Sequence, residues 1–279
     1  MAQGVSGVGA IARGAIGLIN DEPVFLSTAG VYGLTSNIIT AERMVANRSY
    51  YVDPKLTKEA GLENAVACRW KGYFIIGING RCYVIDGRQN KTYWQRSNGE
   101  YVYECFYWDN IPATCWMVRR EPGDEQLWFG TADGRICRFN TDRSGLDRYN
   151  DDGAAIVALW STAADDDGDP TVQKTMLKQG CAVTLKPYQR SGGKVFFRTD
   201  RDAALREVRE GFLDILDFND VDFSRWTFNC NDGPGEIFFR QKVKKYKRLQ
   251  IAVVNDSVNE GFGVFAITKH YVMGNFAKK

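Results

Sequence analysis

A repeated hairpin pattern constrains the fold of this chain more than any other feature of its sequence. Residues 125–142 contain an apolar, aromatic run, then a turn at 132–134 that ends in Asp-Gly, then a segment in which residue character alternates. Glycine takes the positive φ of a tight turn without steric cost, so Asp-Gly between two such runs indicates a β-hairpin. The same pattern surrounds the Asn-Gly pair at 79–80 and Gly30, and it therefore predicts three hairpins.

The remaining elements of the first half are predicted from periodicity and turn signals. The hairpin at Gly30 is expected over residues 23–36 and the Asn-Gly hairpin over 65–86. Apolar residues near helical spacing predict a helix over 38–47, and 56–64 is expected to be a second short helical or turn segment. A further pair of strands is expected over 101–119, joined around an Asn-Ile-Pro turn.

The three turn glycines indicate a possible higher-order repeat. Gly30, Gly80 and Gly134 lie at separations close to those of β-propeller blades, in which roughly 40–50 residues form a four-stranded sheet. The repeat is degenerate, and a simple meander of strands explains the same pattern. We predict an all-β protein in which residues 1–153 form partial β-propeller-like blades.

The second half of the chain has a different pattern. Its composition shifts at 151–153, an acidic, turn-rich stretch follows, and we place the domain boundary there. Residues 154–279 are predicted to form a β-sandwich domain, because several strands of similar length are separated by turn signals. Strands are expected over residues 154–160, 174–187, 194–199, 242–254 and 263–271, whereas 207–216 is compatible with helix or strand.

Composition and charge narrow the range of functions. The chain has 279 residues and a net charge of only +2, which gives no general reason to expect nucleic-acid or membrane binding. Glycines and Arg13 interrupt the apolar N-terminal run, so a signal peptide is not expected, and no run approaches the ~18 apolar residues of a membrane span. The seven cysteines, an odd number without a CxxC motif, are predicted to be free thiols in a reducing compartment.

Three groups of residues are candidates for a catalytic or metal-binding role. His270 is the only histidine, and a surface or interface position is favoured over a catalytic one. The first acidic cluster offers oxygen ligands for Ca²⁺ but lacks the EF-hand pattern, so a solvated loop between domains is preferred. The second acidic cluster, within 214–222, is compatible with a glycosidase carboxylate pair if two carboxylates lie ~5–10 Å apart, although a loop packed on a sheet explains it better. The first cluster is Asp165, Asp166, Asp167 and Asp169; the second is Asp214, Asp217, Asp220 and Asp222, with Asn219. No catalytic residue, metal or cofactor is predicted.

Two further groups are candidates for binding. A basic run is a candidate contact for DNA or a partner protein, because lysines near a polyanion release counterions. The alternative is a solvated edge strand, on which lysines discourage unwanted pairing. Four aromatic residues are candidates for stacking on sugars, with core packing as the alternative. The basic run is Lys242, Lys244, Lys245, Lys247 and Arg248; the aromatic residues are Tyr107, Trp108, Trp116 and Trp128.

Four stretches of the sequence resemble a family of bacteriophage and prophage virion proteins. These stretches are residues 22–56, 106–142, 213–229 and 254–267, so the resemblance spans nearly the whole chain. A more distant resemblance is to packaged-DNA-stabilisation and nozzle-type tail proteins. The shared motifs are structural and not catalytic.

The resemblance implies a non-enzymatic structural protein in the neck or tail of a tailed phage. It further implies assembly in the bacterial host cytoplasm, a final location in the virion, and portal, connector or tail components as partners. A homo-oligomeric ring and contact with packaged DNA are also implied. Longer relatives have more blades upstream, so the missing blades are expected in a longer chain or in another chain. A carbohydrate-binding adhesin and a glycoside hydrolase are the alternatives.

Overall fold

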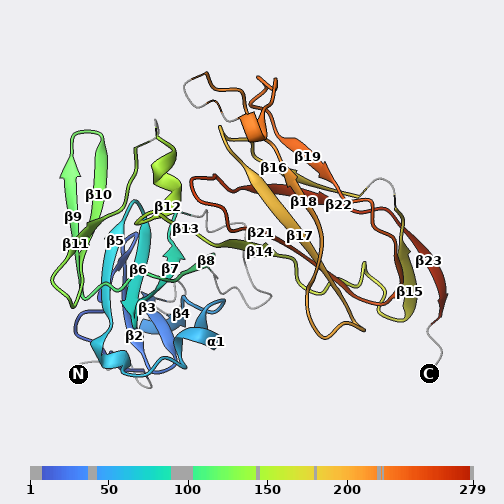
Figure 1. Ribbon diagram of the computed structural model, residues 1–279. Helices are drawn as coiled ribbons and strands as arrows, with labels where there is room; N and C mark the ends of the chain where they lie inside the picture. Colours follow the sequence, from blue (N-terminus) through green and yellow to red (C-terminus); the bar gives the residue numbers. More distant parts are fainter. Residues whose placement is uncertain are drawn as a thin grey trace. The chain divides into compact units, whose positions relative to one another are not determined.

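The computed structural model describes residues 8–36, 43–88, 103–142, 145–178, 181–218, 221 and 223–276. Within these ranges the chain is built from β-strands and short turns, with a short helix, α1 (Asp53–Leu56). The predicted all-β class is therefore confirmed. The chain divides into two compact units, Met1–Thr141 and Asp142–Lys279, which are described separately (Figure 1). The division predicted from the sequence, between residues 153 and 154, lies inside the second unit.

In its described residues, the first unit contains three antiparallel sheets whose strands follow chain order. The first sheet consists of β1 (Ile16–Ile19), β2 (Glu22–Ser27), β3 (Gly30–Ser36) and β4 (Arg43–Asn47). The second consists of β5 (Val66–Trp70), β6 (Tyr73–Ile78), β7 (Arg81–Asp86) and β8 (Cys105–Trp108). The third consists of β9 (Cys115–Glu121), β10 (Asp124–Gly130) and β11 (Ile136–Arg138).

The predicted hairpins are all present, and their turns differ in detail. Asn79 and Gly80 have φ values of 51° and 75°, which is the pair of positive angles that a type I′ turn requires. Between β10 and β11 the connection is longer and runs from Thr131 to Arg135. There the carbonyl of Thr131 accepts a hydrogen bond from the Gly134 N–H, and Gly134 has a φ of 86°. This turn is wider than the tight Asp-Gly turn predicted from the sequence.

Two predictions for the first unit were wrong. The helix predicted over 38–47 is contradicted by β4, which pairs with β3 through Leu34 and Val45; residues 38–42 lie outside the described ranges. The strands expected to pair within 101–119 belong to different sheets, because β8 pairs with β7 and β9 pairs with β10. Residues 56–64 contain the end of α1 and a 3-10 turn, Leu62–Asn64.

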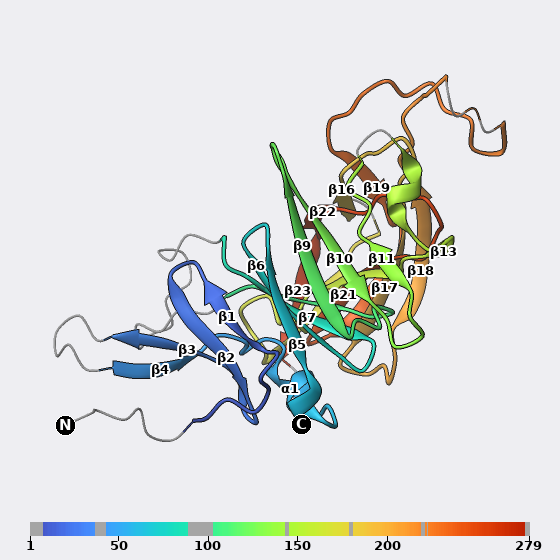
Figure 2. The same cartoon turned by 90° about the vertical axis from the view of Figure 1, so that its left-hand side faces the viewer.

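The three sheets pack on one another in chain order, as Figure 2 shows. Leu26 of the first sheet shares a core with Phe74 and Ile76 of the second. On the opposite face of the second sheet, Ile75 packs in a separate core with Leu127 of the third. The alternation along β6 therefore buries both faces of the second sheet, which lies between the other two.

The described part of the second unit contains four antiparallel sheets. The largest has the order β14 (Ala158–Ser161), β21 (Leu249–Asn255), β17 (Gly192–Thr199) and β18 (Arg206–Phe212). Two three-stranded sheets have the orders β20 (Val243–Tyr246), β15 (Val172–Met176), β23 (Tyr271–Phe276) and β19 (Gly235–Phe238), β16 (Ala182–Leu185), β22 (Val264–Thr268). A two-stranded ribbon joins β12 (Asn150–Asp151) and β13 (Ala154–Ala155).

One core joins the larger sheets of this unit. Val195 and Ile251 from the four-stranded sheet pack with Val183 of β16 and Tyr246 of β20. Leu249, Ile251 and Val253, which lie in the strand expected over 242–254, are each at most 2% exposed.

Several predicted strands of the second unit are divided in the structure. The run 242–254 forms two strands, β20 and β21, with Lys245 at a φ of 54° near the end of the first. Residues 263–271 contain β22 and the start of β23, and 154–160 contains β13 and most of β14. The segment left open at 207–216 is mostly strand β18. Apolar and polar residues continue to alternate across a tight turn. This pattern therefore does not show where one strand ends and the next begins.

Candidate functional site

The structure places the predicted basic run at the edge of a sheet. Strand β20 pairs with β15 and forms one edge of its three-stranded sheet. Val243 and Tyr246 are buried, whereas Lys244 and Lys245 between them are exposed, as is Lys242 before the strand. The three lysines therefore form a solvated, positively charged edge. Lysines on such an edge also oppose pairing with a foreign strand.

The end of the basic run has a different environment. The backbone N–H groups of Lys247 and Arg248 donate to Asp200 Oδ1 at 2.7 and 3.3 Å. Burial raises the pKa of Asp200, but these donors outweigh it and hold the pKa below its ordinary value. Arg248 Nε also lies 4.0 Å from a carboxylate oxygen of Asp166. Acidic groups therefore lie beside this end of the run, and Lys247 and Arg248 stay predicted contacts together with the three lysines of the edge.

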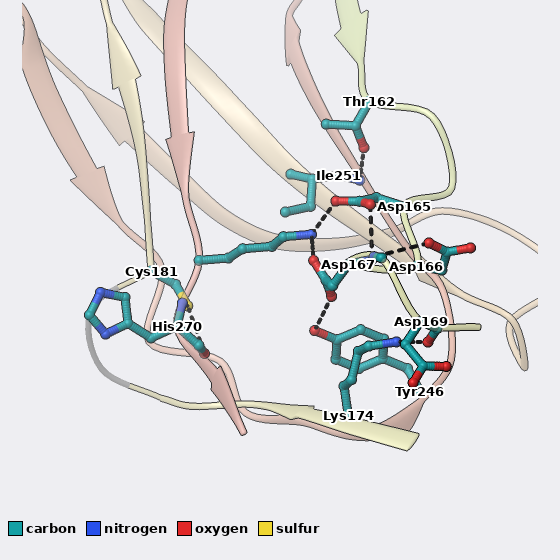
Figure 3. A network of polar contacts seen from close by, with 12 residues as sticks. Thr162, Asp165, Asp166, Asp167, Asp169, Lys174, Cys181, Tyr246, Ile251 and His270 are labelled. Atoms are coloured by element: carbon teal, nitrogen blue, oxygen red, sulfur yellow. Dashed lines mark hydrogen bonds and ion pairs between the residues drawn. The ribbon is translucent and has the colours of Figure 1, made fainter. Parts of the chain in front are cut away.

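The acidic loop, residues 165–169, contacts the C-terminal part of the second unit (Figure 3). Lys269 Nζ lies 2.6 Å from Asp165 Oδ2 and also forms an ion pair with Asp167. Asp167 accepts a hydrogen bond from the Tyr246 hydroxyl at 3.4 Å. The loop lies within one unit, so its prediction as an interdomain loop was wrong. In the described ranges, no group of three or more potential ligand residues could hold a metal ion.

Lys174 is a buried ammonium group that sequence reasoning missed. Its side chain is fully buried, and Nζ donates to the backbone carbonyls of Asp169, Val172 and Lys247. It therefore ties the acidic loop to the connection between β20 and β21. In the sequence Lys174 lies midway between apolar Val172 and Met176, and in β15 all three are buried on the same face.

An exposed aromatic segment follows β18. We use this name for Phe218, Phe223, Trp226 and Phe228, of which the three phenylalanines are at least 80% exposed. The rings of Phe223 and Trp226 are stacked, with their centroids 5.6 Å apart and their planes 7° apart. Trp226 is adjacent to a small pocket whose lining includes Gln189, Asp214 and Arg225.

Arg225 anchors this segment to the sheet beneath it. Its guanidinium binds Asp214 through Nε at 3.0 Å and Nη2 at 2.7 Å, and it forms a further ion pair with Glu260. The side chains of Asp214 and Glu260 are 9% and 2% exposed. Burial lowers the pKa of Arg225, but its hydrogen bond to Glu260 and the charge of Asp214 outweigh that effect and raise the pKa.

The predicted carboxylate pair is only partly described. Asp214 is engaged by Arg225, and Asp217 accepts a hydrogen bond from Gln189. Asn219, Asp220 and Asp222 lie outside the described residues. His270 is exposed, as predicted, but lies in the connection between β22 and β23 and not within a strand.

The aromatic candidates of the first unit divide into two groups. Tyr107, Trp108 and Trp116 pack against the buried cores, which confirms the core alternative for these three. Trp116 Nε1 also donates to the Val66 carbonyl at 3.3 Å. Trp128 instead lies on the opposite face of the third sheet, beneath the guanidinium of Arg138.

Comparison with known proteins gives no assignment. No protein-family model matches the chain, and no curated protein matches it significantly. Among the helices in the described parts of the chain, none has the length and apolar character needed to cross a membrane.

Proposed function

We propose that this chain is a structural protein of a tailed bacteriophage or prophage particle, in its neck or tail region, and that it acts by assembly and not by catalysis. The observation that carries this proposal is the exposed aromatic segment. Soluble monomers rarely expose contiguous apolar patches, and aromatic side chains are enriched in protein interfaces. Arg225 holds this segment in place through buried ion pairs, so its aromatic groups are presented to a partner in a fixed arrangement.

The arrangement of the first unit supports the propeller-like part of the proposal. The first strands of the three sheets lie next to one another, as the inner strands of propeller blades do. The Ala67 N–H donates to the Gly14 carbonyl before β1 at 2.7 Å, and Trp116 of β9 bonds the Val66 carbonyl of β5. We infer that the three sheets are partial propeller blades.

The arrangement of the second unit supports a β-sandwich. The four-stranded sheet contributes Phe197 and Val253 to a core, and the three-stranded sheets contribute Leu185 and Met176 to the same core. Inward-facing residues of two sheet layers that share one core define a sandwich. In the proposed particle this domain presents the aromatic segment to neighbouring proteins.

The proposed partners are portal, connector or tail components and further copies of the chain in a ring. Cyclic association of identical chains requires heterologous interfaces, in which two different surfaces of each copy meet. The chain would assemble in the bacterial host cytoplasm and remain in the virion. The exposed lysines of the β20 edge are the proposed contact with packaged DNA.

Incorporation into particles tests this proposal. Particles induced from the host strain that carries the gene are purified, and the chain is quantified in them by mass spectrometry. Replacing Phe223 and Phe228 by Ser should reduce incorporation by about tenfold or more, because central aromatic side chains often contribute about 2 kcal/mol or more to binding. The matched control is Phe265→Ser, which alters a 61% exposed phenylalanine of β22 in the same unit. Absence of the chain from particles, or normal incorporation of the double variant, would contradict the proposal.

The DNA contact is tested separately by binding to double-stranded DNA at several salt concentrations. Replacing Lys242, Lys244 and Lys245 by Gln should weaken binding and reduce the salt slope by about three, since each phosphate contact contributes about 0.9. Lys55→Gln together with Lys58→Gln, in the first unit, is the control. An unchanged salt slope in the β20 variant would exclude this edge as the contact.

A carbohydrate-binding adhesin is the second candidate, favoured by one observation. The stacked rings of Phe223 and Trp226 are exposed beside a pocket lined by the polar side chains of Gln189 and Asp217. Aromatic faces with adjacent polar groups are suited to sugar rings. Glycan-array binding that is lost in Trp226→Ala would favour this function, whereas no binding by the wild type would exclude it.

A further inference from the structure

The first and third sheets of the first unit each have an outer face, turned away from the second sheet. On the first sheet this face carries Ile16, Phe25 and Tyr32, which are aligned across β1, β2 and β3, and also Leu18 and Leu34. Ile16 is 58% exposed and Leu18 45% exposed. We call this surface outer face 1. Apolar side chains on a sheet face are stabilised when another layer covers them.

The outer face of the third sheet is also apolar. Met117 and Trp128 are paired across β9 and β10, and Ile136 lies on the same face of β11. Met117 is 54% exposed and Ile136 76% exposed. We call this surface outer face 3. Both ends of the three-sheet stack therefore present apolar side chains to solvent.

The contact between the second and third sheets shows which side chain packs against a sheet face of this kind. Gly77 of β6 lies opposite Val66, and a Cβ at Gly77 would be 3.1 Å from Trp116 Cζ2. The missing side chain thus leaves room for the indole of the next sheet. Gly130 occupies the corresponding place in β10, opposite Cys115 of β9. A Cβ there would lie 2.9 Å from Cys115 Sγ and would have no other atom within 4 Å, so on outer face 3 only the Cys115 thiol adjoins this position.

The indole N–H groups of the two tryptophans in the third sheet have different environments. Trp128 Nε1 is buried and has no hydrogen-bond partner among the described atoms. In contrast, Trp116 Nε1 donates to a backbone carbonyl of the adjacent sheet. A buried N–H group without a partner is unusual, because buried polar groups are normally satisfied.

We propose that outer face 3 of one copy packs on outer face 1 of a second copy, head to tail. This continues the stack already formed twice within the chain, and it rests on the proposed function because it supplies the interface for self-assembly. Ile16 and Leu18 lie on the first strand of their sheet, on the face turned away from the following sheet. Trp116 likewise lies on the first strand of its sheet, on the face turned toward the preceding sheet, and its indole fills the space beside Gly77. The contact is heterologous, and repeating it closes a ring if the rotation allows.

Disulfide crosslinking of the full chain tests the contact directly. Cys115 is an exposed native thiol beside Gly130 on outer face 3. Cys230 is the other exposed thiol and is replaced by Ser in every variant. With Ile16→Cys added, mild oxidation should give a ladder of dimers and larger species on a non-reducing gel. Thiols held together at a contact have an effective concentration near the millimolar range, so the yield should exceed that of the Phe265→Cys control by about tenfold or more.

Two further variants decide between the possible contacts. Adding Cys115→Ser should abolish the ladder; a dimer that persists would indicate a symmetric contact between two copies of outer face 1 and would overturn the proposal. By light scattering, the wild type should be larger than a monomer and Ile16→Asp should be monomeric, whereas Phe265→Asp should match the wild type. A wild-type monomer, or an oligomer unaffected by Ile16→Asp, would overturn the proposed contact. If either of these results were obtained and the chain were still incorporated into particles, only the proposed contact would be overturned, and the proposed function would not be.

Discussion

Lys269 Nζ lies 2.6 Å from Asp165 Oδ2, which joins two segments of the second unit that are 104 residues apart in the chain. The hydrogen bond from Lys269 is the main reason that the pKa of Asp165 lies below its ordinary value. Burial lowers the pKa of Lys269, but its hydrogen bonds to Asp165 and Asp167 outweigh burial and raise it. Because both pKa values are shifted, the stability of this unit depends on Asp165 at acidic pH and on Lys269 at alkaline pH.

The acid side of this link gives the first prediction. The pKa of Asp165 is lower in the folded state, so its contribution is complete above the unfolded value of about 3.9 and is lost as pH falls through the folded value. The stability of the second unit should therefore decrease less steeply below about pH 4 in Asp165→Asn than in the wild type. Urea unfolding between neutral and acidic pH measures this difference. Equal slopes for the two proteins would contradict it.

Loss of Arg225 should destabilise the aromatic segment. Arg225→Met leaves Asp214 and Glu260 as buried carboxylates without their cation, and breaking such a pair costs about 3–5 kcal/mol. Denaturant unfolding and limited proteolysis within residues 214–229 should both report the change. Arg206→Met is the control, because Arg206 is 67% exposed in its pair with Asp202 and little change is expected. Unaltered proteolysis of the Arg225 variant would show that this ion-pair network does not hold the segment.

Overpacking should occur when a side chain is added at Gly77. Gly77→Val places methyl groups against the Trp116 indole, and inserting atoms into a packed core typically costs about 1–3 kcal/mol. The first unit should unfold at a lower urea concentration in this variant. Gly9→Val is the matched control, because a Cβ at Gly9 would have nothing within 4 Å. Wild-type stability of the Gly77 variant would mean that the second and third sheets are not packed as described.

Thiol reactivity should separate the cysteines by their environment. Burial raises the pKa of Cys82 to about 12, and the coulombic effect of Cys68 adds to this shift. Because the thiolate is the reactive form, Cys82 should resist alkylation at pH 8 in the folded protein, whereas exposed Cys115 and Cys230 should react first. Mass spectrometry of peptides after timed labelling measures the order, with urea-denatured protein as the control. Labelling of Cys82 as fast as Cys115 would contradict the described burial.

The sequence alone determined the features that depend on neighbouring residues. The Asn79-Gly80 pair predicted its hairpin correctly, because both residues accept the positive φ of a type I′ turn. The expected strand over 242–254 includes β21, in which Leu249, Ile251 and Val253 alternate and are buried, because successive side chains of a strand point to opposite faces. Such signals are local, and they indicated the all-β class without knowledge of the sheet partners.

Only the tertiary structure decided which strands share a sheet and which charges meet. Strands β8 and β9 are close in the chain but belong to different sheets, since β8 pairs with β7 and β9 pairs with β10. Arg43–Asn47 forms a strand because β3 supplies its pairing partner, although the local pattern also suits a helix. Arg225 forms a hydrogen-bonded ion pair with Glu260, 35 residues away in the chain. Lys174 donates to the carbonyl of Lys247, 73 residues away. These arrangements depend on groups distant in sequence, so burial and long-range pairing select them from several conformations that the local sequence allows.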